Sequence, residues 1–134
     1  MTQEEMLNLA KKAINETPGF IKHNNFKVED VSTEYAKMSV ELTEETLNPN
    51  GVAHGGLLFG LADTTMGLLA RTTGRNVTTI NAHIDYLKPG IGKKLTCTAE
   101  AIKVGKATGV YRANIYNEEE QLVSTVTATF FFLD

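Results

Sequence analysis

The chain has 134 residues, of which 42% are hydrophobic and 22% charged, with a formal net charge of −3. This balance is that of one globular domain over residues 1–134 and excludes a disordered or disulfide-rich chain. The acidic charge and the absence of a Lys/Arg cluster argue against nucleic acid as a partner.

The cysteine count and the N-terminus narrow the class and the location further. No Cys/His set has the spacing of a zinc site, so the sequence predicts no metal centre. The single cysteine, Cys97, shares one face of an alternating segment with Ala99 and Ala101, which predicts a small buried thiol rather than a nucleophile. Glu4 and Glu5 stand where an export signal needs positive charge, which predicts a cytoplasmic protein. The longest weakly polar stretch contains Asn, Pro, His and Asp, so no membrane span is expected.

The first predicted element is a helix over residues 2–15. Thr2 and Glu5 have the spacing of a capping box. Apolar residues then recur at three- and four-residue intervals, as in an amphipathic helix: Met6, Leu9, Ala10, Ala13 and Ile14. Strand signals begin near Phe26, and apolar and polar residues alternate over 34–42, which predicts a sheet with one covered and one wet face.

The one long helix of the body is predicted over residues 55–73, with Gly74 as its C-cap. Apolar or small residues recur along it at helical spacing: Leu57, Leu58, Leu61, Thr64, Thr65, Leu68 and Leu69. Each of three internal glycines, Gly56, Gly60 and Gly67, weakens the helix by about 1 kcal/mol relative to Ala. Their small size therefore indicates close approach by the sheet or by a partner.

Four strand-like runs follow, at roughly 76–87, 94–104, 107–116 and 121–133. Short turns separate them, and short turns join antiparallel strands, so the predicted fold class is α+β rather than a doubly wound parallel sheet. A central helix that is apolar on most sides then needs a curved sheet around it or a second subunit over it.

Asp63 is the only charged residue between Glu45 and Arg71. A carboxylate in a helix otherwise suited to burial is costly unless it has partners or takes up a proton, so Asp63 is a candidate general base. The alternatives are a solvent-facing position or a carboxylate paired with Thr64 or Thr65.

A turn of unusual composition, Asn48–Gly56, precedes this helix and contains His54, Gly55 and Gly56. Free N–H groups at a helix start bind anions, and two glycines let a ligand come close, as an oxyanion hole requires. Gly-Gly is also common in ordinary turns, and His54 could simply neighbour the N-cap.

The spacing of these candidates limits how they can cooperate. Asp63 lies eight residues after Gly55, which is about 12 Å along a helix. His54 and Asp63 of one chain are then too far apart to act on one carbonyl. Either they have separate roles, or two chains pair with antiparallel helices and form two equivalent composite sites.

The same residues resemble the PaaI-type (phenylacetic acid degradation) acyl-CoA thioesterases of the hotdog superfamily, over most of the chain. The resemblance rests on Asn48-x-x-Gly51-x-x-His54-Gly55-Gly56 followed by Phe59, Asp63 and Gly67, on Asp85-Tyr86-Leu87-Lys88-Pro89, and on Lys103-x-Gly105-Lys106. It implies a hotdog fold, in which an antiparallel sheet wraps around the central helix, here with an extra N-terminal helix. It also implies a homodimer, often a dimer of dimers forming a homotetramer.

The resemblance further implies hydrolysis of an acyl-CoA or aryl-CoA thioester, with no cofactor because coenzyme A is part of the substrate. Asp63 would activate water or attack the thioester carbonyl itself. The Gly55 N–H would be the oxyanion donor, assisted by Asn48 and His54 of the facing subunit. Thr79, or its neighbour Thr78, would hold the water. The implied substrate-binding residues are Gly56, Leu57, Phe59, Lys88, Lys103 and Lys106.

Two other functions fit the pattern less well. A hotdog-fold dehydratase or hydratase uses a His base, but His54 lies in a Gly-Gly turn rather than in the proline-flanked pattern of those enzymes. A non-catalytic acyl-CoA-binding module would keep the pocket without needing Asp63. His83 and Asp85 are predicted on the polar face of a strand. The acyl group, aryl or aliphatic, stays open.

Overall fold

The computed structural model describes all residues, 1–134. It contains three helices, six strands and a short 3₁₀ turn at Glu44–Thr46. In chain order the helices and strands are α1 (Gln3–Asn15), α2 (Phe20–His23), β1 (Phe26–Val31), β2 (Tyr35–Glu41), α3 (Gly55–Arg71), β3 (Val77–Tyr86), β4 (Lys94–Val104), β5 (Thr108–Tyr116) and β6 (Leu122–Phe132).

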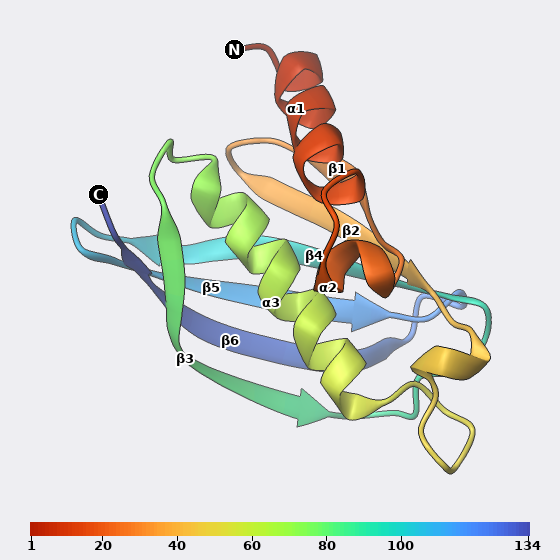
Figure 1. Cartoon of the computed structure of the whole chain (residues 1–134). Coiled ribbons are helices and arrows are strands. Elements are labelled where there is room, and N and C mark those ends of the chain that lie inside the picture. The colour runs from red at the N-terminus through yellow and green to blue at the C-terminus, as the bar shows by residue number, and fades with distance from the viewer.

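The six strands form one antiparallel sheet in the order β1-β2-β4-β5-β6-β3, which curves around α3 (Figure 1). This confirms the predicted hotdog fold. The sheet has two edge strands, β1 and β3. Figure 1 shows α1 and α2 on the β1 side of α3 and β3 on the other side, so the long helix is flanked differently along its two sides.

The core lies between α3 and the concave face of the sheet. Leu61 and Met66 of α3 are completely buried, as are Ala36, Met38 and Val40 of β2, which confirms the predicted alternation. The opposite face of β2 was expected to be wet throughout, and Ser39 corrects this. Ser39 is buried and donates a hydrogen bond to Glu29 Oε1 at 2.6 Å, which together with Lys94 holds the pKa of Glu29 below its usual value.

The predicted helix ends are close to those observed. α1 begins directly after Thr2, and both hydrogen bonds of the predicted capping box with Glu5 are present. α3 ends at Arg71 rather than at residue 73. The N–H groups of Thr72 and Thr73 bond carbonyls three residues back, and their hydroxyls bond the same carbonyls, which closes the helix early.

The close approach predicted for the glycines of α3 occurs at Gly60. A Cβ there would lie 3.2 Å from the ring of Phe20, so the glycine makes room for α2 rather than for the sheet. No helix of this structure is long and apolar enough to cross a membrane.

A β-bulge in β3 decides which of its side chains face α3. Thr79 pairs with Phe130 and Asn81 with Thr129, so Ile80 has no partner in the β6 ladder. The extra residue shifts the alternation by one, so odd-numbered side chains can face the helix before the bulge and even-numbered side chains after it. At the bulge the apolar side chain of Ile80 is 56% exposed.

Candidate active site

Asn48 shapes the turn that leads into α3. Its side-chain carbonyl accepts hydrogen bonds from the N–H groups of Asn50, at 2.9 Å, and Val52, at 3.3 Å. The side-chain oxygen of Asn48 therefore stabilises the turn in which Asn48 itself lies. The side-chain amide nitrogen makes no hydrogen bond within the chain and remains free to donate.

His54 is the N-cap residue of α3, whereas one interpretation of the sequence made it only a neighbour of the N-cap. Its Nδ1 accepts a hydrogen bond from the N–H of Gly56 at 2.8 Å. An imidazole nitrogen that accepts carries no proton, so the proton of the neutral ring is on Nε2. His54 is thus oriented as a donor. Because Gly56 N–H is engaged in this bond, it is not available to a ligand.

Gly55 provides the free donor of the first helical turn. The N–H groups of Leu57 and Leu58 both bond the carbonyl of His54, while Gly55 N–H has no partner in the chain. The hydroxyl of Tyr86 donates to Gly55 O at 2.9 Å and ties this turn to the end of β3. Sequence reasoning named Tyr86 only within the motif Asp85-Tyr86-Leu87-Lys88-Pro89 and gave it no role, although its alternation with Ala82 and Ile84 was a usable signal.

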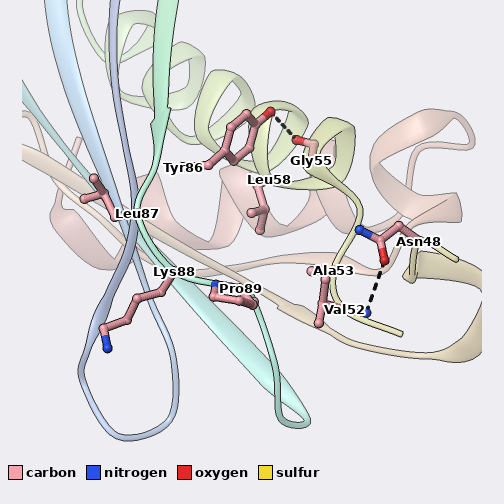
Figure 2. A pocket seen from close by; sticks show the side chains of 10 residues that line it. Asn48, Val52, Ala53, Gly55, Leu58, Tyr86, Leu87, Lys88 and Pro89 are labelled. Atoms are coloured by element: carbon pink, nitrogen blue, oxygen red, sulfur yellow. Dashed lines mark hydrogen bonds between the residues drawn. The ribbon is translucent and has the colours of Figure 1, made fainter. Parts of the chain in front are cut away.

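A cavity of about 380 Å³ lies over this turn (Figure 2). Its lining includes Asn48, Gly55, Leu58, Tyr86 and Lys88, drawn from the turn, α3 and the end of β3. Asn48 and Gly55, which carry the free donors, therefore border one space, which we call the donor cavity.

Two of the expected substrate contacts lie elsewhere. Leu57 is a core residue, 5% exposed, and does not line the donor cavity, whereas Leu58, which is 2% exposed, does. Phe59 is half-buried and lines neither the donor cavity nor the cavity beside Asp63.

Asp63 lies half-buried on the side of α3 that faces β3. Its Oδ1 accepts a hydrogen bond from the Thr79 hydroxyl at 2.6 Å. The partners suggested by spacing do not take this role, because Thr65 is buried and donates instead to Leu61 O. Of the two candidate threonines on the strand, Thr79 makes the contact with Asp63, while Thr78 is exposed.

A second cavity, of about 530 Å³, opens beside Asp63, and we call it the carboxylate cavity. Thr64, Gly67 and Arg71 of α3 line it together with Thr79. No residue lines both the donor cavity and the carboxylate cavity. One chain therefore holds the candidate donors and the candidate base in separate spaces, about 12 Å apart along α3.

The three candidate lysines also divide between distant places. Lys88 lies on the border of the donor cavity and extends away from Gly55 (Figure 2). Lys103 and Lys106 are exposed on the β4–β5 hairpin, where the carbonyl of Lys106 accepts a hydrogen bond from Arg75, beyond the end of α3. One chain thus does not bring them together.

Other titratable groups are removed from both cavities. His83 and Asp85 are exposed and lie 3.1 Å apart, as predicted for the polar face of β3. Cys97 is completely buried, which confirms the predicted buried thiol. No cluster of three or more His, Cys, Asp or Glu side chains in the structure could hold a metal ion.

The chain belongs to the thioesterase superfamily, whose family model matches residues 50–124. It is 36% identical over 91 residues to the acyl-coenzyme A thioesterase PaaI of Escherichia coli (strain K12), covering 67% of this chain. The match spans just under two thirds of that relative's own length, 65%.

Two solved structures share the fold. The E. coli PaaI protein from the phenylacetic acid degradation operon superposes with a TM-score of 0.90 at 26% identity, covering 99% of this chain and 97% of the other. A hypothetical thioesterase from Streptococcus pneumoniae TIGR4, solved with coenzyme A, gives 0.78 at 32% identity, covering 81% and 89%.

Proposed function

We propose that this chain is an acyl-CoA thioesterase whose active site is shared by two copies. The observation that carries the proposal is the separation of the free Gly55 donor from the Asp63–Thr79 pair in two cavities on one helix. Each cavity holds half of what thioester hydrolysis needs. Family membership and the relative solved with coenzyme A support the CoA thioester as substrate.

The chemistry follows from the groups present. Asp63 accepts a proton from a water molecule that the Thr79 hydroxyl helps to place, and the water oxygen attacks the thioester carbonyl. Negative charge develops on the carbonyl oxygen, which Gly55 N–H stabilises. The carbon–sulfur bond then breaks, and the proton held by Asp63 passes to the departing CoA thiolate. The products are a carboxylic acid and coenzyme A.

Asn48 and His54 assist from the donor side. The free amide of Asn48 and the Nε2–H of His54 both donate, so either can hold the oxyanion or the leaving sulfur. The same geometry argues against a dehydratase. With Nδ1 engaged by Gly56 N–H and the proton on Nε2, His54 has no free lone pair with which to act as a base.

A second copy is proposed to pair along β3. This strand is an edge of the sheet, so its outer backbone groups lack strand partners, and Ile80 exposes an apolar side chain there. A two-fold axis at this edge makes the pairing antiparallel and places two α3 helices side by side in opposite directions. The donor cavity of one copy then faces the carboxylate cavity of the other. A dimer of dimers is a further proposal.

The test combines a thiol-release assay with subunit mixing. The wild type should release CoA from at least one member of a panel of aryl-, short-, medium- and long-chain acyl-CoAs. His54→Ala and Asp63→Asn proteins, each nearly inactive, should recover about a quarter of wild-type sites when mixed, because random exchange makes half the dimers mixed and repairs one of their two sites. Absence of CoA release from every substrate refutes the activity. Absence of recovery despite demonstrated exchange refutes the shared site.

A further inference from the structure

The carboxylate cavity continues past Asp63 across the outer side of α3. It shares four lining residues with a third cavity, of about 380 Å³, that lies between α1 and the C-terminal end of α3: Ala13, Ile14, Leu68 and Arg71. The two cavities are therefore adjoining parts of one groove. The groove runs about 12 Å along the helix from Asp63 to Arg71.

The third cavity is almost entirely apolar. Met6, Leu9 and Val31 contribute to its lining, and Arg71 is its only charged side chain. The Arg71 guanidinium donates to Asn76 Oδ1 at 3.1 Å, which leaves the aliphatic stem of Arg71 to face the groove. Its chemistry suits a hydrocarbon and offers little to a polar or charged group.

The apolar stripe of α1 is held in place and only partly covered: Leu9 and Ala13 are exposed, while Met6 and Ile14 are half-buried against the core. Ala10 is the only buried residue of α1, and Leu9 is 57% exposed. Hydrogen bonds fix the helix to β1 near both ends, from Gln3 to Asp30 at 3.4 Å and from Val28 N–H to Asn15 at 3.3 Å. An anchored helix with an open apolar side marks a place for an apolar ligand.

Gly67 forms part of the floor between Asp63 and the apolar end. A Cβ at this position would meet only Phe130, at an ordinary 3.7 Å, so packing within the chain does not require glycine here. A side chain would instead narrow the path over the helix. Glycine has a lower helix propensity than alanine, but its lack of a side chain makes the groove deeper at this position.

We propose that this groove binds the aliphatic chain of the acyl group, so that the preferred substrates are medium- or long-chain acyl-CoAs. The inference rests on the proposed function, because Asp63 must act on the thioester for the acyl chain to enter the groove from its polar end. With the carbonyl beside Asp63, the chain passes Gly67 and ends between α1 and the last turn of α3. Each methylene buried there improves kcat/KM by up to about fourfold.

The experiment compares kcat/KM for straight-chain acyl-CoAs of increasing length in wild type, Ala13→Phe and Lys11→Phe. Ala13 is exposed and lines both parts of the groove, so a phenyl ring there blocks the passage without disturbing the core. Lys11→Phe adds the same ring to the same helix outside the groove. Thermal unfolding of all three proteins checks that the fold is kept.

Wild type and Lys11→Phe should favour long chains. Ala13→Phe should lose at least about tenfold on long chains and change little on the shortest one. Gly67→Ala raises the helix propensity, so it cannot act by weakening the helix. It should also lower kcat/KM for long-chain acyl-CoAs. Absence of hydrolysis on any acyl-CoA defeats the proposed function. Three results would overturn the groove assignment while leaving the proposed function intact. They are a kcat/KM that does not rise with chain length, an aryl-CoA as the best substrate, and a chain-length profile that is unchanged in Ala13→Phe.

Discussion

The first turn of α3 and its middle are built in different ways. At the N-terminal end, the free donor is a backbone N–H, and a network of loop hydrogen bonds through Asn48 and His54 presents it. In the middle of the helix, the candidate base is one side chain, and a single hydroxyl from a bulged edge strand orients it. The donor is thus a backbone group that the side chains of Asn48 and His54 hold in place, whereas the base is itself a side chain.

This difference predicts how each region responds to mutation. Removing Asp63 removes a reacting group, whereas most side-chain changes in the donor region leave its N–H in place. Loss of the His54 side chain removes the N-cap of the donor turn and a second donor, but only a substitution that deletes the N–H removes the Gly55 donor itself. Tests of the comparison therefore need changes of different kinds at the first turn and at Asp63.

The largest effect is expected for Asp63→Asn. Asparagine keeps the size of the side chain and can still accept the Thr79 hydrogen bond, but it cannot take a proton from water. The kcat on the best acyl-CoA should fall by about 10²–10⁴-fold. Binding of CoA, measured by calorimetry, should change little. Full activity in the variant would exclude Asp63 as the base.

Gly55→Pro should give the next largest effect. Proline suits the first position of a helix, and the extended backbone of His54 fits the residue before proline, so the change deletes one free N–H at little cost to the fold. A Cβ at this position would lie 3.0 Å from the Tyr86 hydroxyl oxygen and 3.1 Å from the ring carbon that carries it, so both this variant and its control are made in a Tyr86→Ala background.

The control is Gly55→Ala, which adds the same Cβ and keeps the N–H. Gly55→Pro should lower kcat by about 10²–10³-fold relative to that control, which is the range for losing one oxyanion donor. Equal loss in both variants would mean that the Cβ, and not the missing N–H, is responsible.

Residue spacing was sufficient to predict the α+β class, and the family resemblance implied the sheet wrapped around the central helix. Alternation over 34–42, capping at Thr2 and the long apolar helix reflect local propensity and burial, both of which can be read from residue spacing. Asp63 was a candidate because it is the only charge in an apolar helix. Its partner could not be chosen by spacing, because Thr79 reaches it only after β3 folds back beside α3.

The bulge at Ile80 shows the limit of pattern reading. A strict two-residue period cannot place both Thr79 and Tyr86 on the side of β3 that faces the helix, yet both side chains bond α3. One extra residue in the ladder changes the period. Tyr86 was missed for a related reason, since a tyrosine on an apolar face indicates packing before it indicates a hydrogen bond to a helix end.

A smaller effect is expected for Thr79→Val, which keeps the shape of the side chain and removes its hydroxyl. Asp63 then loses its partner but keeps its carboxylate, so kcat should fall about tenfold, the equivalent of one hydrogen bond to a charged group. Thr79→Ser, which keeps the hydroxyl, should restore most of the rate. Thr78 also lines the carboxylate cavity but makes no contact with Asp63, so Thr78→Val tests the alternative and should keep most of the rate. A drop equal to that of Thr79→Val would assign the water to both.

The smallest effect concerns Cys97, which lies under α3 against Thr65, two residues from Asp63 on the opposite side of the helix. Burial raises the pKa of the thiol from its usual 9.0 to about 12. Between about pH 9 and 12 the thiol stays protonated in the folded protein but loses its proton in the unfolded chain. The free energy of unfolding should therefore decline as pH rises from about 9 toward 12.

At pH 8 a thiol reagent should neither label Cys97 in the native protein nor inhibit the protein, whereas labelling in urea should be complete. Fast native labelling would mean that the carboxylate cavity opens through to the core, and the two faces of α3 would then not be separate.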